Sequence, residues 1–170
     1  YAIRIQRLSL FLGKYSSKAI RFSSINSFHF VSFTKCITFD LSKPTFRHEM
    51  FGEYKAGRRS MPDELRPQMS LIKDVLRAMN IPILELEGYE ADDILGTLSD
   101  IYTGADSCII ATGDRDALQL VTDNVSVVLT ATKAGHPETT VYTPQAVLEK
   151  YSVTPLELID VKALMGDSSD

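Results

Sequence analysis

Four short clusters of acidic residues constrain the fold of this chain more than any other feature. Most of them stand where an apolar run gives way to a polar turn or a helix start, as in CITFD, GYEADDIL, CIIATGDRDAL and ALMGDSSD. In an α/β fold such positions gather at one edge of the sheet, so residues far apart in the sequence face one another there. The eight carboxylates of these clusters are Asp40, Glu90, Asp92, Asp93, Asp114, Asp116, Asp167 and Asp170.

Gathering so many carboxylates is unfavourable unless cations lie among them. Two unit charges ~4 Å apart repel by ~4 kcal/mol at the effective dielectric constant of a protein surface. Oxygen ligands are those that Mg²⁺ and Mn²⁺ prefer. The clusters therefore predict a divalent-metal site that binds Mg²⁺ or Mn²⁺, with two ions as the expected number.

Each cluster also has an ordinary structural explanation. The three acids of GYEADDIL suit the first turn of a helix, where negative charge complements the helix dipole. Asp114 and Asp116 suit an Asx turn that caps a helix. Asp167 and Asp170 are weak evidence when taken alone. We favour the metal site because all four clusters occupy matching positions in the expected topology.

Apolar periodicity and turn signals beyond Asp40 predict alternating strands and helices. Helices are expected over 66–80 and 90–102, after a Thr143 cap followed by Pro144, and from Thr154 to Leu164. Strands are expected over 83–86, 108–111 and 126–129, with a short extra strand that closes at Tyr142. This order predicts an α/β fold built on a three-layer, mainly parallel sheet.

Composition excludes several classes of protein. With 44% hydrophobic and 24% charged residues, the 170-residue chain can bury an ordinary core, and one domain is expected. Cys36 and Cys108 are expected to be free thiols in a reducing compartment. The apolar runs are too short to span a membrane, and the phosphate loop GxxxxGK and the nucleophile elbow GxSxG are absent. We therefore expect a cytoplasmic monomer that makes no membrane contact.

The first 39 residues differ from the rest, because they carry six basic side chains and no acid. One interpretation is a segment similar to an organellar transit peptide. Another, which we favour, is that the coding frame or fragment boundary is wrong there. A poorly packed basic helix or strand is a third interpretation. We accordingly treat 1–39 as an atypical basic segment and 40–170 as the folded core.

A basic and aromatic stretch, PTFRHEMFGEYKAGRRSMP, follows Asp40. If it is helical over 45–58, one face carries cations interleaved with rings. Such a face suits a nucleic-acid strand, because phosphates attract the cations and bases stack on the rings. The alternative is an amphipathic helix whose rings enter the core while its cations reach water. The candidate nucleic-acid contacts are Arg47, Phe51, Tyr54, Lys55, Arg58 and Arg59.

Six segments together carry a family resemblance. They are FDLSKPTFRHEMFGEYKAGR, MPDELRPQ, LELEGYEADDILGTL, ATGDRDALQLV, VYTPQAVLEKY and LIDVKALMGDSSD. In order, spacing and content they resemble the 5′ nuclease domain at the N-terminus of bacterial DNA polymerase I, which belongs to the flap endonuclease family with a PIN-like, Rossmann-like fold. The resemblance covers about residues 39–170.

The resemblance implies metal-assisted hydrolysis of DNA at 5′ ends, flaps or nicks, in DNA replication and repair. It assigns Asp40 to the end of an earlier strand. The acids that it assigns to metal binding are Glu90, Asp92, Asp93, Asp114, Asp116, Asp167 and Asp170. Arg47, Tyr54, Lys55 and Arg58 match the basic arch that grips the 5′ strand. The implied catalytic residues are Lys55 and Arg58, which offset charge on the phosphate, together with Asp114 and Asp116.

The sequence also departs from the family in two places. The family begins with a strand similar to LLLIDGNSL whose Asp binds metal, whereas no acid precedes Asp40 here. The chain ends where the family continues into a helix-hairpin-helix element. Two alternatives to the nuclease therefore stay open: a catalytically impaired metal- or DNA-binding remnant, and a Mg²⁺ phosphatase with an aspartyl-phosphate intermediate.

Overall fold

A computed structural model of the chain describes residues 35–58, 60–102, 107–133 and 135–166. The predictions for Arg59, Asp167 and Asp170, and almost all of those for 1–39, lie outside the described residues. No helix in the described part of the chain is long and apolar enough to cross a membrane.

Strands and helices alternate through the described ranges as the sequence pattern predicts. In chain order the elements are β1 (Ile37–Thr38), α1 (Phe46–Met50), α2 (Arg66–Ala78), β2 (Ile83–Leu84), α3 (Ala91–Tyr102), β3 (Cys108–Thr112), the 3-10 helix η3 (Arg115–Leu120), β4 (Val125–Lys133), β5 (His136–Tyr142), α4 (Pro144–Tyr151) and α5 (Leu158–Met165).

The described strands form two sheets. β1 pairs with β2 in parallel, β3 pairs with β4 in parallel, and β5 is antiparallel to β4. Helix α3 contacts both β1 and β3, so it joins the two sheets. The predicted parallel pairing is confirmed for β3 and β4, and β5 is the predicted extra strand that closes at Tyr142.

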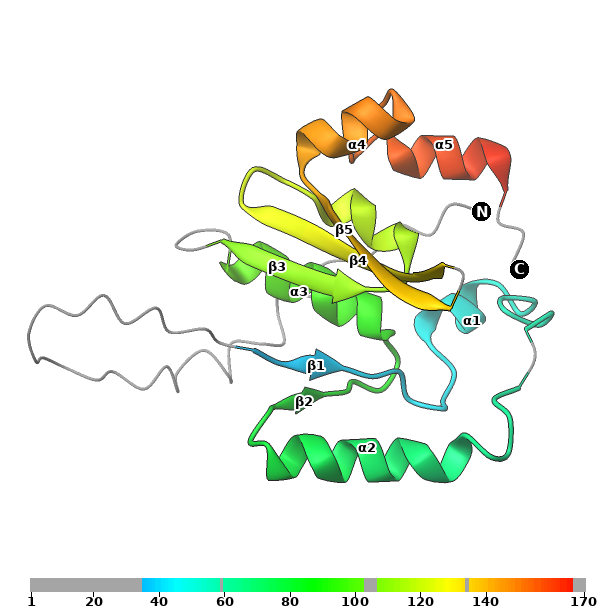
Figure 1. The fold of residues 1–170 in the computed structure, drawn as a ribbon. Helices are drawn as coiled ribbons and strands as arrows, with labels where there is room; N and C mark the ends of the chain where they lie inside the picture. Colours follow the sequence, from blue (N-terminus) through cyan, green and yellow to red (C-terminus); the bar gives the residue numbers. More distant parts are fainter. Residues whose placement is uncertain (1–34, 59, 103–106, 134, 167–170) are drawn as a thin grey trace, which may run out of the picture.

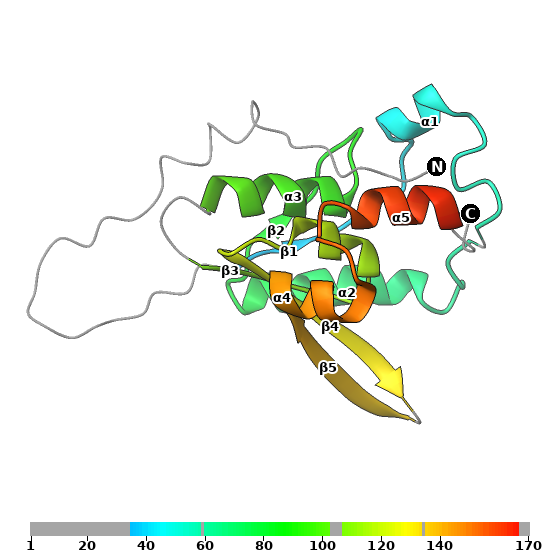
Figure 2. The same ribbon diagram turned by 90° about the horizontal axis from the view of Figure 1, so that it is seen from above.

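The helices lie on different sides of these sheets (Figure 1). Helices α4 and α5 lie together at one end of the molecule, and α2 runs along the other end beside β2. Viewed from above, the ends of β4 and β5 project beyond the helices as a two-stranded ribbon (Figure 2). The arrangement leaves the carboxyl ends of β1 and β3 on the side where α1 lies (Figure 1).

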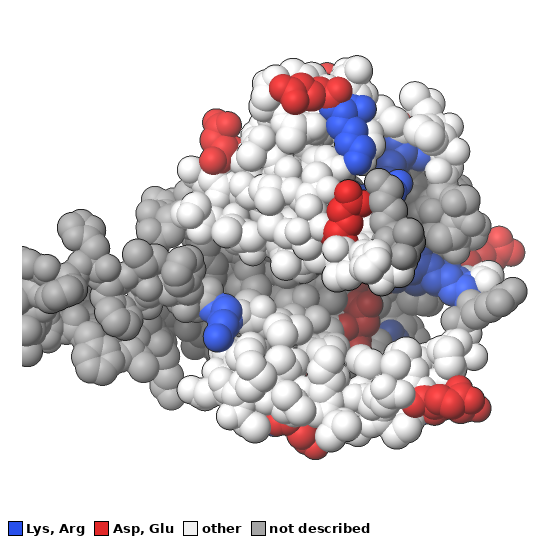
Figure 3. Space-filling view, in the orientation of Figure 1, with Lys and Arg blue, Asp and Glu red and all other residues white. Residues whose placement is uncertain are grey.

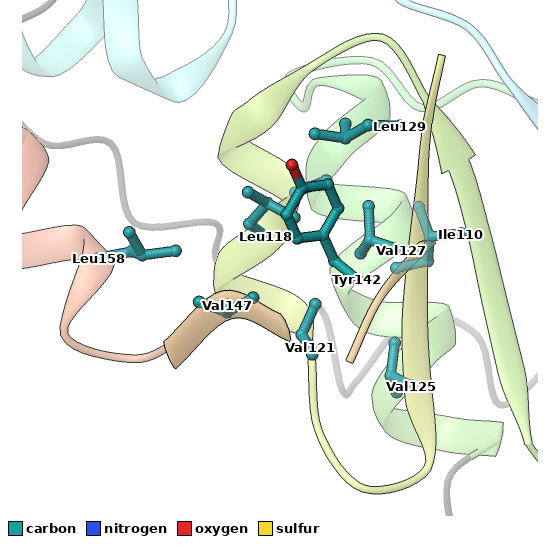
Figure 4. Close-up of a cluster of buried hydrophobic side chains, with 10 residues drawn as sticks. Ile110, Leu118, Val121, Val125, Val127, Leu129, Tyr142, Val147 and Leu158 are labelled. Carbon is teal, nitrogen blue, oxygen red and sulfur yellow. The ribbon is translucent and has the colours of Figure 1, made fainter. Parts of the chain in front are cut away.

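The main core lies between β3, β4, β5, η3 and the two last helices. Alternate residues of β4 point inward, so Val125, Val127 and Leu129 are buried while their neighbours are less so. These side chains gather near the ring of Tyr142 (Figure 4). The buried members are Ile110, Ala117, Leu118, Val121, Val125, Val127, Leu129, Tyr142, Val147 and Leu158.

Local sequence signals explain where several helices begin. Thr143 is the N-cap of α4, where its hydroxyl accepts a hydrogen bond from the Ala146 N–H at 3.3 Å, and Pro144 occupies the first turn. Helix α5 runs from Leu158, and Thr154 and Glu157 form a capping box in the turn that leads into it. The Thr154 N–H donates to Glu157 Oε2 at 2.8 Å, and the Glu157 N–H donates to the Thr154 hydroxyl at 3.4 Å.

The conditional prediction of one helix over 45–58 is wrong. Helix α1 ends at Met50, because Phe51 turns to extended backbone at φ −145°. A series of turns follows, in which Lys55 adopts the left-handed conformation at φ 59°. Gly52 and Gly57 flank that residue, and glycine costs about 1 kcal/mol relative to alanine inside a helix. The cations and rings of this stretch therefore do not form one helical face.

The apolar face of α2 is mostly exposed, although the helix itself is predicted correctly. Leu76 is buried, but Leu71, Ile72, Val75 and Met79 are exposed. Periodicity predicted the helix without indicating which side would be covered.

Candidate active site

The end of β1 and the start of α3 are joined by Asp40. Its Oδ1 accepts a hydrogen bond from the Ala91 N–H at 2.6 Å, between residues 51 apart in sequence. An acidic side chain at a helix start is favoured by the unpaired N–H groups and the helix dipole. The first two acidic clusters therefore meet in space.

Helix α3 begins with a carboxylate that is fully removed from solvent. Asp93 is 0% exposed, and its Oδ2 accepts a hydrogen bond from the Glu90 N–H at 3.0 Å. Arg47 donates to both oxygens of Asp93, from Nη1 at 2.7 Å and from Nη2 at 2.8 Å. Burial opposes the charged guanidinium, but the bond and charge of Asp93 prevail and raise the pKa of Arg47. This bidentate pair fixes α1 to the start of α3.

Glu90 is buried beside the same pair and binds the turns after α1. Lys55 Nζ lies 2.7 Å from Glu90 Oε1, and the Tyr54 hydroxyl donates to Oε2 at 3.2 Å. Arg47 Nη1 lies 3.6 Å from Glu90 Oε2. Burial, followed by the charge of Glu90, raises the pKa of Tyr54. Three predicted nucleic-acid contacts thus bind protein carboxylates here.

The pKa of Asp92, near the start of α3, is raised by burial and by acids from other stretches of the chain. Burial first, then the negative charges of Asp114, Asp40, Glu90 and Asp93, raise its pKa to about 6. Asp114 belongs to the turn after β3, and Asp40 to the chain after β1. Acids that follow β1 and β3 thus both act electrostatically on Asp92 near the start of α3.

Asp114 and Asp116 form the turn that leads from β3 into η3. Asp114 is the N-cap, and its Oδ1 accepts a hydrogen bond from the Asp116 N–H at 2.8 Å. The Asx-turn interpretation is confirmed by this bond. The Asp116 side chain lies against Lys162 of α5 as an ion pair.

The predicted nucleic-acid residues divide into two groups. Arg47 is 7% exposed and paired with Asp93, whereas Phe51 and Arg58 lie on the surface. On the face shown in Figure 3, basic and acidic side chains are scattered among uncharged ones, and no large patch of one sign is visible. The sequence indicates the Arg47–Asp93 pair only in part: a buried arginine needs an acidic partner, but its position in the chain does not say which one. Nothing in the sequence spacing indicated that Lys162 would contact Asp116.

Three of the carboxylates, Glu90, Asp93 and Asp116, lie against cations of the protein in this structure. Within the ranges that the structure describes, no three His, Cys, Asp or Glu side chains form a group that could hold a metal ion. Their chemistry nevertheless fits a hard divalent cation, since the donors are oxygens and Asp92 is crowded by like charge. Cys36 and Cys108 are free thiols, as expected.

Comparison with known proteins gives concordant results. The family of the 5′-3′ exonuclease, N-terminal resolvase-like domain matches residues 22–152. DNA polymerase I of Bacillus caldotenax is 49% identical over 136 residues, which is 79% of this chain and 15% of that protein. A 5′-3′ exonuclease of Bacillus subtilis (strain 168) is 45% identical over 131 residues, 77% of this chain and 44% of that protein.

Solved structures resemble the fold over most of the chain. The T5 D15 protein co-crystallised with metal ions has a TM-score of 0.65 and 25% identity, covering 82% of this chain and 55% of that one. The T5 5′-exonuclease with divalent metal ions (zinc) bound gives the same TM-score and identity, with 54% of its chain covered. The chain spans about 15% of the DNA polymerases that it matches and about half of the T5 proteins.

The sheet arrangement, the acids at the strand ends and the match over residues 22–152 agree with one another. This chain belongs to the family of the 5′-3′ exonuclease N-terminal, resolvase-like domain.

Proposed function

We propose that this chain is a metal-dependent 5′-3′ exonuclease and 5′-flap endonuclease acting on DNA, as the N-terminal part of a DNA polymerase I-like protein. The observation that carries the proposal is the crowding of Asp92 by Asp114 and Asp40, which come from separate strand ends. Family membership supports the same activity, since relatives are named DNA polymerase I and 5′-3′ exonuclease. A cluster of carboxylates that binds divalent metal suits phosphodiester hydrolysis.

The metal would be Mg²⁺ or Mn²⁺, with two ions as the proposed number. Asp40, Asp92 and Asp114 would hold it first, because the first and last of these follow separate strands and their negative charges crowd Asp92. Asp116, Asp167 and Asp170 would complete the set. When bound, such ions activate a water for attack and stabilise charge on the leaving oxygen. Glu90 and Asp93 would position α1 and the following turns through Lys55 and Arg47.

The substrate strand would approach over the turns after α1. Phe51 is 44% exposed and offers a ring on which a base can stack. Lys55 and Arg58 would offset charge on the phosphate during cleavage. Arg47, Tyr54 and Arg59 remain predicted contacts, of which Arg47 would act through Asp93. We propose 5′ ends, flaps and nicks as substrates, and a cytoplasmic monomer as the working form.

A catalytically impaired remnant is the second candidate, and one observation favours it. Three of the predicted metal ligands, Glu90, Asp93 and Asp116, already pair with a lysine or arginine of the chain. A site neutralised by its own cations binds metal more weakly, because the ion must displace them.

A cleavage assay separates the two candidates. We expect slow Mg²⁺-dependent cutting of a 5′-labelled flap DNA, abolished by chelator and by Asp114→Asn. The matched control is Asp123→Asn, which removes an exposed acid from the turn before β4 and should cut like the parent chain.

Two further results would redirect the proposal. Cutting that appears only after an acid-ended first strand is added at the N-terminus would support the remnant, and no cutting even then would exclude the nuclease. A trapped phospho-aspartate would indicate the phosphatase chemistry instead.

A further inference from the structure

Lys162 lies in the middle of α5, and its ammonium contacts the carboxylate of Asp116 on η3. Helix α5 is anchored to the core at its first residue, Leu158, which is 8% exposed. The packing of Leu158 holds α5 in place, and in this position Lys162 lies at the turn after β3. Neither residue is close to the other in sequence, so this contact depends on the tertiary fold.

One side-chain oxygen of Asp116 depends on this lysine. Asp116 Oδ1 is buried, and in the described part of the chain the Lys162 ammonium is the group that contacts it. A buried carboxylate oxygen left without a partner is costly. The lysine therefore neutralises this oxygen in the metal-free protein.

Asp93 provides the contrast. Both of its oxygens receive directed bonds from Arg47, and a third bond comes from the Glu90 N–H. Replacing Arg47 by an ion would break two good hydrogen bonds inside the protein. Replacing Lys162 would break a contact whose lysine side chain is 43% exposed and can return to water. Of these two acids, Asp116 is the one whose cation can exchange.

We propose that Lys162 is a built-in counter-ion that competes with divalent metal for Asp116 and so weakens metal binding. The inference rests on the proposed function, because it takes Asp116 to be a ligand of that metal. In the metal-free protein Lys162 holds the acid in place. When a divalent ion binds, the lysine leaves Asp116, and the oxygen that it contacted becomes a ligand.

Mn²⁺ titration by calorimetry tests this with the full 170-residue chain. Lys162→Met should tighten Mn²⁺ binding by about two- to five-fold, the range expected when a partly exposed ion pair no longer competes. Lys162→Arg should restore weaker binding. Lys150→Met is the matched control, because it removes the same charge from the neighbouring helix α4, where Lys150 bonds the Tyr142 hydroxyl instead of an acid.

Thermal melting of the metal-free protein gives a second, independent readout. Without metal, Lys162→Met should lower the melting temperature. Adding Mn²⁺ should then raise the melting temperature of the Lys162→Met protein by more than it raises that of the Lys150→Met protein. Equal Mn²⁺ affinity in the parent, Lys162→Met and Lys150→Met chains would overturn the competition. Absence of Mn²⁺ binding in the parent chain would instead overturn the proposed metal site, and the inference with it.

Discussion

Replacing Arg47 by methionine should destabilise the protein strongly, because it removes the cation that donates to both oxygens of the buried Asp93 carboxylate. The Arg47 side chain is 8% exposed and that of Asp93 is 0% exposed, with Nη1 and Oδ2 2.7 Å apart. Removing one partner of such a buried pair costs about 3–5 kcal/mol. Methionine keeps much of the apolar volume, so most of the loss should come from the charge.

The chain contains a well-matched control for this change. Arg77 and Asp74 are also 2.7 Å apart, but their side chains are 62% and 68% exposed. Exposed pairs contribute about 0.2–1 kcal/mol. The Arg77→Met protein should therefore unfold almost like the parent, although it loses a salt bridge of the same length.

Urea unfolding followed by circular dichroism, with chelator present, measures both free energies. Adding Asp93→Asn to Arg47→Met should recover part of the loss, since asparagine is neutral and can still accept from the Glu90 N–H. A loss for Arg47→Met within about 1 kcal/mol of that for Arg77→Met would refute the reasoning. It would mean that water or another group reaches Asp93.

The metal-free protein should also respond to pH through Asp92, whose pKa in the folded state is about 6 against an ordinary 3.8. Because a raised carboxyl pKa adds stability that is present below about pH 4 and lost as pH rises through about 6, Asp92→Asn should raise the melting temperature at pH 7.5 and leave it unchanged near pH 4; equal effects at both pH values would count against this. In the core, Leu118→Ala should cost about 2–5 kcal/mol in urea unfolding, whereas Leu164→Ala, at an 89% exposed position, should cost less than about 0.5 kcal/mol. Similar losses for the two leucines would contradict the described core. Thr143→Ala should cost about 1 kcal/mol through the lost cap of α4, and an unchanged unfolding midpoint would show that the cap is dispensable.

Local signals in the sequence predict most of the elements, because caps and periodicity act over a few residues. The Thr143 cap with Pro144 fixes the start of α4, and the acids of GYEADDIL indicate the start of α3. The helix expected over 45–58 fails for a tertiary reason. Its cations bind Glu90 and Asp93, more than thirty residues away, and those bonds favour turns over a regular helix.

In the site, too, some features follow from the order of strands and helices, whereas others depend on contacts between residues far apart in the sequence. Strand ends predicted that Asp40, Asp92 and Asp114 would come together, because topology alone sets their positions. Which acids hold protein cations depends on contacts between residues far apart, such as Lys162 with Asp116. A charged side chain beside a ring looks the same in sequence whether its partner is a phosphate or a buried aspartate.

Affinity cleavage with Fe²⁺ tests the central claim most directly, since an iron ion bound in the metal site generates hydroxyl radicals that cut the nearby backbone. If carboxylates from separate strand ends share one divalent-metal site, ascorbate and peroxide should produce cuts near Asp40, near Asp92 and near Asp114, all suppressed by excess Mg²⁺. Cuts confined to one of these stretches, or cuts that Mg²⁺ does not suppress, would contradict a shared site.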